Sequence, residues 1–171
     1  NRYIDAIELD TGISSKNFIL VGFSQGTMMV LETLLSREKK ISAVVGFSGG
    51  FLNVKNKVSK INLDTPILLV HGDEDNVVPM EMTKMAKKNL NILGYFVNTY
   101  FSKGLGHGIS MDGLTETTKF LKKLNILFQT FVGFFLFLNF YFKLLLKKNI
   151  VIICLQEHTA IILNLQEKIL L

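Results

Sequence analysis

The 171-residue sequence predicts an α/β fold with a doubly wound, mostly parallel sheet. Short apolar runs that are typical of buried strands alternate with stretches of helical periodicity. Glycine-containing loops follow three of these strands, and each loop holds a residue type that could take part in acyl-transfer chemistry. Fold class and candidate site are therefore predicted from the same pattern.

Four strands and three helices are predicted along the chain. The strands cover residues 18–22, 41–47, 66–71 and 95–101. A first amphipathic helix is indicated by the spacing of Tyr3, Ile4, Ile7 and Leu9. A second helix is indicated by Met28, Met29, Leu31, Leu34 and Leu35, and a third covers residues 111–124.

The turn after the first strand has the pattern of a nucleophile elbow. Gly22-Phe23-Ser24-Gln25-Gly26 follows an apolar run directly and precedes the second predicted helix. In such an elbow the serine sits on a sharp strand-to-helix turn, which needs glycine on both sides because the backbone is strained and the helix packs close to the strand. Ser24 is therefore the candidate nucleophile.

The other two members of a Ser-His-Asp triad are expected downstream, the acid first and the histidine second. The strand 66–71 leads into a loop with two candidate acids, Asp73 and Asp75. The strand 95–101 leads into Gly106-His107-Gly108, where the flanking glycines let the backbone bring the imidazole close to a serine. His107 is therefore the candidate general base.

These three motifs together resemble the phospholipase/carboxylesterase family of α/β-hydrolases, which includes the acyl-protein thioesterases. The matching strings are GFSQG at 22–26, HGDEDNVVP at 71–79 and GHGIS at 106–110, in the order of the family. The resemblance covers residues 1–124, which we interpret as a partial α/β-hydrolase domain. It implies a serine hydrolase of carboxylic ester or thioester bonds, with small esters or acylated proteins as substrates.

The resemblance also implies a role for each site residue. The nucleophile corresponds to Ser24, the triad acid to Asp75 rather than Asp73, and the general base to His107. The backbone N–H of Gln25 would contribute to the oxyanion hole. These motifs determine neither the length of the acyl chain nor whether the substrate is an ester or a thioester.

Other polar residues near the motifs have simpler interpretations. His71 is expected to be a structural residue of its loop, because the base follows the acid in this fold. Ser48 ends a different strand and is expected to be a turn residue, while Ser110 and His158 have no partner pattern around them. Thr27 stands where the family usually has glycine, so its side chain must pack where the helix approaches the sheet.

The stretch before the nucleophile strand is short. The family has further strands, a helix and a glycine-rich turn there, and one of these turns gives the second oxyanion N–H. The sequence is therefore expected to be a fragment or the product of a split or decayed gene, with a non-catalytic remnant as the alternative to an enzyme. The outer edge of the strand 18–22 should then be exposed or covered by the apolar tail.

Residues 125–171 form an apolar tail with a composition unlike that of the preceding domain. This segment has seven of the 14 phenylalanines and no proline or aspartate. Its run 126–142 is mostly apolar and lies near the lower length limit for a membrane span. A C-terminal anchor is one interpretation, and a translated segment without selected structure is the favoured one, because polar interruptions weaken a spanning helix.

Composition excludes several functional classes. The net charge of +5 comes with scattered lysines rather than a basic stripe, so no nucleic-acid partner is expected. No His/Cys/Asp cluster has metal-ligand spacing and no G-x-G-x-x-G occurs, so neither a metal nor a dinucleotide cofactor is expected. A single cysteine, Cys154, excludes an intramolecular disulfide and favours a reducing compartment, hence a cytoplasmic location.

Overall fold

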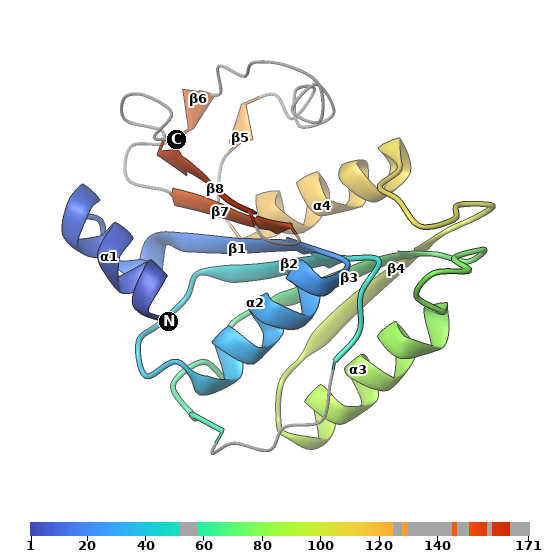
Figure 1. Cartoon of the computed structure of the whole chain (residues 1–171), viewed down its shortest axis with the longest axis horizontal. Coiled ribbons are helices and arrows are strands. Elements are labelled where there is room, and N and C mark those ends of the chain that lie inside the picture. Colours follow the sequence, from blue (N-terminus) through green and yellow to red (C-terminus); the bar gives the residue numbers. More distant parts are fainter. Residues whose placement is uncertain (52–57, 125–127, 130–144, 147–150, 157–158, 165–171) are drawn as a thin grey trace.

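The computed structural model describes residues 1–51, 58–124, 128–129, 145–146, 151–156 and 159–164. Its central feature is a six-stranded sheet with helices on both faces (Figure 1). The elements in chain order are α1 (Arg2–Thr11), a 3-10 turn η1 (Ser15–Asn17), β1 (Phe18–Phe23), α2 (Gln25–Ser36), β2 (Ala43–Phe47), β3 (Ile67–Gly72), α3 (Met80–Ile92), β4 (Val97–Ser102), α4 (Met111–Lys123), β5 (Phe128–Gln129), β6 (Leu145–Leu146), β7 (Val151–Gln156) and β8 (Thr159–Asn164).

The sheet has the strand order β4-β3-β2-β1-β7-β8. The first five of these strands are parallel, and β8 pairs antiparallel with β7. The four predicted strands are confirmed within two residues at each end. Because β1 to β4 are parallel, the loops that follow them open at the same edge of the sheet, where ligands bind in doubly wound folds.

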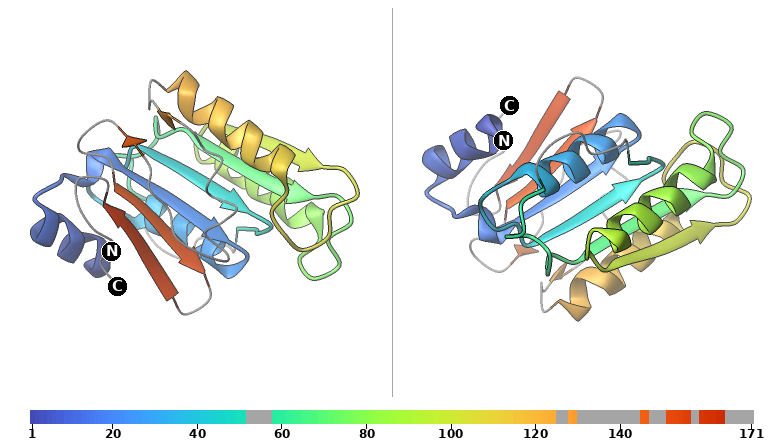
Figure 2. Two further views of the ribbon diagram at one scale, coloured as in Figure 1. Left: turned by 90° about the horizontal axis from the view of Figure 1, so that it is seen from above. Right: turned by 90° about the horizontal axis from the view of Figure 1, so that it is seen from below.

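Side chains alternate between the two faces of the strands and form two separate cores. Phe18 and Leu20 of β1 pack with α1, α2 and α3, whereas Ile19 and Val21 pack on the opposite face with α4. Figure 2 shows α4 in front of the sheet in one view and α2 with α3 in front in the other. Apolar area buried on both faces is the main stabilising contribution to such a fold.

The outer edge of β1 is covered. β7, from the tail, pairs with β1 in parallel, with Phe18 opposite Val151 and Gly22 opposite Leu155. Of the two outcomes expected for this edge, the structure has the one in which the tail covers it. Residues 151–156 and 159–164 of the tail form strands of the sheet.

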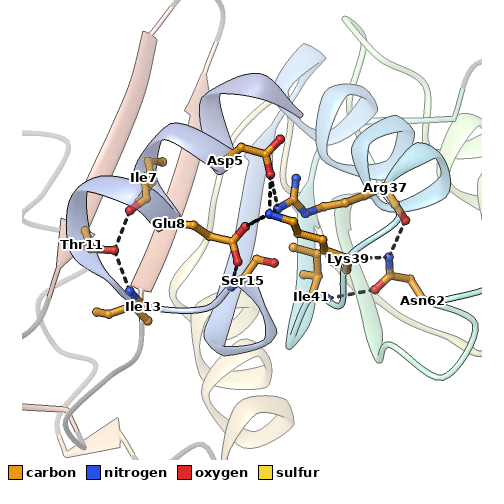
Figure 3. A network of polar contacts seen from close by, with 10 residues as sticks. All are labelled: Asp5, Ile7, Glu8, Thr11, Ile13, Ser15, Arg37, Lys39, Ile41 and Asn62. Atoms are coloured by element: carbon orange, nitrogen blue, oxygen red, sulfur yellow. Dashed lines mark hydrogen bonds and ion pairs between the residues drawn. The ribbon is translucent and has the colours of Figure 1, made fainter.

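The helix α1 is confirmed, but its predicted apolar face is narrower than expected. Ile4 and Ile7 are buried, whereas Tyr3 and Leu9 are exposed. A polar network fixes the helix to the turn after α2 (Figure 3). Arg37 is buried in this network, and its Nη2 lies 2.9 Å from an oxygen of Asp5 and 3.0 Å from one of Glu8.

One further prediction concerns the apolar run 126–142, for which a C-terminal membrane anchor was one interpretation. The run 126–142 lies outside the described residues except for 128–129, which form β5. Within the described ranges, no helix has the length and apolar character needed to cross a membrane.

Candidate active site

Ser24 occupies a tight, strained turn between β1 and α2. Its backbone φ is 53°, in the positive range that residues other than glycine seldom adopt. Its N–H donates to the carbonyl oxygen of Phe47 at 2.9 Å. A Cβ on Gly22 would lie 2.4 Å from the carbonyl carbon of Gly26, so position 22 requires glycine. The backbone therefore has the sharp bend that the sequence pattern predicts.

Thr27 replaces a glycine of the family pattern without opening the elbow. Its Oγ1 lies 2.8 Å from the carbonyl oxygen of Phe47 and 3.0 Å from that of Gly22. Its side chain fills the space beside Gly46 and Gly49, where an added Cβ would lie 2.4 Å from it. Two glycines on neighbouring segments thus accommodate the threonine.

Asp75 lies in the loop after β3, with its side chain buried. One carboxylate oxygen, Oδ1, accepts hydrogen bonds from the N–H groups of Val77 and Val78, both at 2.9 Å. Burial raises the pKa of Asp75, but the hydrogen bond from His107 and those from Val78 and Val77 outweigh it, so this pKa lies below its ordinary value. The carboxylate is therefore ionised at neutral pH.

His107 joins the elbow to the acid loop. Its Nδ1 lies 2.8 Å from Oδ2 of Asp75, and its Nε2 lies 3.1 Å from Oγ of Ser24. The Phe23 ring packs against the imidazole at 5.0 Å between centroids. The sequence analysis did not predict this contact of Phe23 with His107. The position of Phe23 directly before Ser24 could have indicated it.

Asp73, the alternative acid, has a different place in the structure. Its Oδ1 accepts a hydrogen bond from the N–H of Gly104 at 2.6 Å. Gly72, the last residue of β3, also packs closely against the loop before His107, because an added Cβ would lie 2.1 Å from the carbonyl oxygen of Leu105. Asp73 and Gly72 therefore hold the loop that carries His107.

His71 is buried and contacts the loop that carries Asp75. Its Nδ1 lies 2.7 Å from the hydroxyl of Thr83, and its Nε2 lies 2.8 Å from the carbonyl oxygen of Val78. The same Nε2 lies 3.2 Å from Oδ2 of Asp75. These contacts connect the loop to α3, which agrees with a structural role.

The other residues considered in the sequence do not belong to the row of hydrogen bonds that joins Ser24, His107 and Asp75. Ser110 is the N-cap of α4 and accepts from the Gly113 N–H, while Ser48 is buried at the end of β2. His158 lies outside the described residues. Gln25 begins α2, where the first N–H groups have no acceptor within the helix. Among the described residues, no group of three or more His, Cys, Asp or Glu could hold a metal ion.

Comparisons with known proteins show the family of the chain. The model of the phospholipase/carboxylesterase family matches residues 2–125. The chain is 36% identical over 121 residues to acyl-protein thioesterase 1 of Gibberella zeae, covering 68% of this chain and 52% of that protein. It is 36% identical over 124 residues to acyl-protein thioesterase 1 of Saccharomyces cerevisiae, covering 68% and 53%. The chain thus spans about half the length of these curated relatives.

Solved structures give the same picture of the fold. Esterase PE8 superposes with a TM-score of 0.67 at 35% identity, over 72% of this chain and 57% of that one. SOBER1 of Arabidopsis thaliana superposes with a TM-score of 0.66 at 26% identity, over 72% and 60%. The matched regions therefore leave 43% and 40% of those two chains unmatched.

Proposed function

The chain belongs to the phospholipase/carboxylesterase family of α/β-hydrolases, and on that premise we propose that it cleaves carboxylic ester or thioester bonds. In this proposal Ser24 is the nucleophile, His107 the general base and Asp75 the acid that orients the base. The supporting observation is the continuous row of two hydrogen bonds, 3.1 Å from Ser24 to His107 and 2.8 Å from His107 to Asp75.

The direction of these hydrogen bonds follows from their partners. An ionised carboxylate only accepts, so His107 must carry its proton on Nδ1, which faces Asp75. The lone pair of Nε2 then faces the hydroxyl of Ser24, in the position that a general base requires. Asp75 therefore selects the useful tautomer and stabilises the imidazolium when it forms.

Acylation begins when Oγ of Ser24 attacks the carbonyl carbon of the substrate and His107 Nε2 takes the hydroxyl proton. The carbonyl π electrons move to oxygen, and the backbone N–H of Gln25 donates to this oxyanion. When the tetrahedral intermediate collapses, the bond to the alkoxide or thiolate breaks and His107 returns the proton to that leaving group. The acyl group is then bound to Ser24 as an ester.

Deacylation repeats the same proton movements with water. His107 removes a proton from the water molecule as its oxygen attacks the acyl carbon, and then protonates Oγ of Ser24 as the acyl-enzyme bond breaks. The carboxylic acid leaves and the hydroxyl of Ser24 is restored. No step needs a metal or an organic cofactor.

The relatives named as acyl-protein thioesterases favour S-acylated proteins as substrates, with small carboxylic esters as the simpler class. A thiolate is a better leaving group than an alkoxide, so a site that cleaves carboxylic esters would also cleave thioesters. We also propose a cytoplasmic location, because the single cysteine, Cys154, forms no intramolecular disulfide.

The proposal is tested by steady-state hydrolysis of p-nitrophenyl acetate and of an S-acylated peptide by the whole chain. We expect turnover above the buffer rate, and a loss of more than about 10³-fold in Ser24→Ala. Ser36→Ala, at the far end of α2, is the matched control and should keep the wild-type rate. Equal rates for Ser24→Ala and wild type would exclude Ser24 as nucleophile, and a wild type without turnover would favour the non-catalytic alternative.

A further inference from the structure

Ser48 lies beside the proposed triad, at the carboxyl end of β2. It is fully buried, and its N–H donates to the carbonyl oxygen of Val70 on β3 at 2.9 Å. Its backbone φ is 46°, a positive value that is costly for any residue with a side chain. Ser24 shares this property, and the two are the non-glycine residues with positive φ in the described part of the chain. Glycine would adopt this conformation freely, so the serine must offer something that glycine lacks.

The hydroxyl of Ser48 makes a contact across 60 positions of sequence. Oγ donates to the carbonyl oxygen of Gly108 at 2.9 Å. Gly108 directly follows His107, so the bond connects the loop of the proposed base to the strand next to the elbow. Serine is the smallest residue that supplies a side-chain donor at this buried, strained position.

His107 is held between two anchors. On its N-terminal side, Asp73 accepts from the Gly104 N–H at 2.6 Å. On its C-terminal side, Ser48 donates to Gly108. With both sides of a short loop fixed, the imidazole is kept at its distance from Ser24. Rates of acyl transfer are sensitive to such placement, since an error of about 1 Å can cost about 10²-fold.

We propose that Ser48 is a positioning residue for His107, an inference that rests on the proposed function. It acts through the Gly108 carbonyl and does not touch the substrate. The strained backbone at Ser48 is retained because the hydroxyl fixes the loop so that Nε2 of His107 stays 3.1 Å from Oγ of Ser24.

The test compares Ser48→Gly and Ser48→Ala with wild type in the rate at which a fluorophosphonate labels Ser24. Both variants lose the donor, and both should label about 10- to 100-fold more slowly. They differ in stability: Ser48→Gly relieves the positive φ and should keep the thermal midpoint of wild type, whereas Ser48→Ala should unfold earlier. Ser15→Ala removes another buried serine hydroxyl far from the site and should label at the wild-type rate.

Slow labelling by a variant as stable as wild type separates positioning from a general role in folding. Wild-type labelling by Ser48→Gly and Ser48→Ala would overturn the inference. A second readout does not need reactivity: the proton on Nδ1 of His107, bonded to Asp75, should give a downfield NMR signal that weakens in both variants. If wild type fails to label, the proposed function fails, and an unchanged NMR signal would then refute the role of Ser48 separately.

Discussion

Replacing Gly22 by alanine is expected to distort the turn that carries Ser24. The new Cβ would lie 2.4 Å from the carbonyl carbon and oxygen of Gly26 and 2.5 Å from the backbone nitrogen of Thr27. These are backbone atoms at the start of α2, so no flexible side chain can move aside. Ordinary contact requires a separation of about 3.5 Å, and α2 must therefore move by about 1 Å relative to β1.

This displacement has a cost in stability and a cost in reactivity. Overpacking of this kind destabilises by about 1–3 kcal/mol, and the rigid backbone favours the upper part of that range. For a protein of this size the thermal midpoint should fall by roughly 4–12 °C. A shift of about 1 Å in Ser24 should slow its labelling by a fluorophosphonate about 10²-fold.

The assay combines urea unfolding with labelling kinetics. Gly106→Ala is the control for stability, because its Cβ would meet nothing closer than an oxygen of Glu74 at 3.9 Å, and it should stay within about 1 kcal/mol of wild type. If Gly22→Ala unfolds at the wild-type urea concentration and labels at the wild-type rate, the argument from the tight elbow is refuted.

Three other substitutions test separate parts of the structure. The pKa of Asp112 should be about 2 by NMR titration, mainly because of its hydrogen bond with Ser110, and Ser110→Ala should raise this pKa. Because the pKa is lowered on folding, the ionised Asp112 stabilises the fold above about pH 4, and this stabilisation is lost as the pH falls toward 2. Arg37→Ala should cost about 2 kcal/mol in urea unfolding, because the two carboxylates of α1 lose their buried partner, and a loss below 0.5 kcal/mol would contradict this. Thr27→Val should cost about 1 kcal/mol through its lost hydrogen bonds, whereas equal stability would show that the hydroxyl is dispensable.

The fold of the central domain was predictable because its strands are short, apolar and bounded by glycine-containing turns. The helix α3 was not predicted, since its buried side chains are only Thr83, Ala86 and Leu90 within a largely polar segment. Its place against the sheet is fixed by tertiary packing rather than by a clear apolar period. The sequence allowed for the tail to cover the edge of β1, but the strand that does so and its register with β1 are long-range features that it did not specify.

The three triad candidates could be proposed from motifs because each lies in a loop after a strand. The contacts that support them were less accessible to sequence reasoning. The bond from Ser48 to Gly108 and the fit of Thr27 beside Gly46 join segments far apart in the chain. Such contacts depend on backbone placement to within a fraction of an ångström, which local patterns do not specify.

The most direct test of the central claim is the site and rate of fluorophosphonate labelling in the whole chain, read by peptide mass spectrometry. The account predicts an adduct on Ser24, with labelling slowed about 10⁴-fold by Asp75→Asn, which leaves His107 without its orienting carboxylate. Asp73→Asn should slow labelling less than about tenfold, because the asparagine oxygen can still accept from Gly104. An adduct on another serine, or equal rates for the two aspartate variants, would contradict the proposed triad.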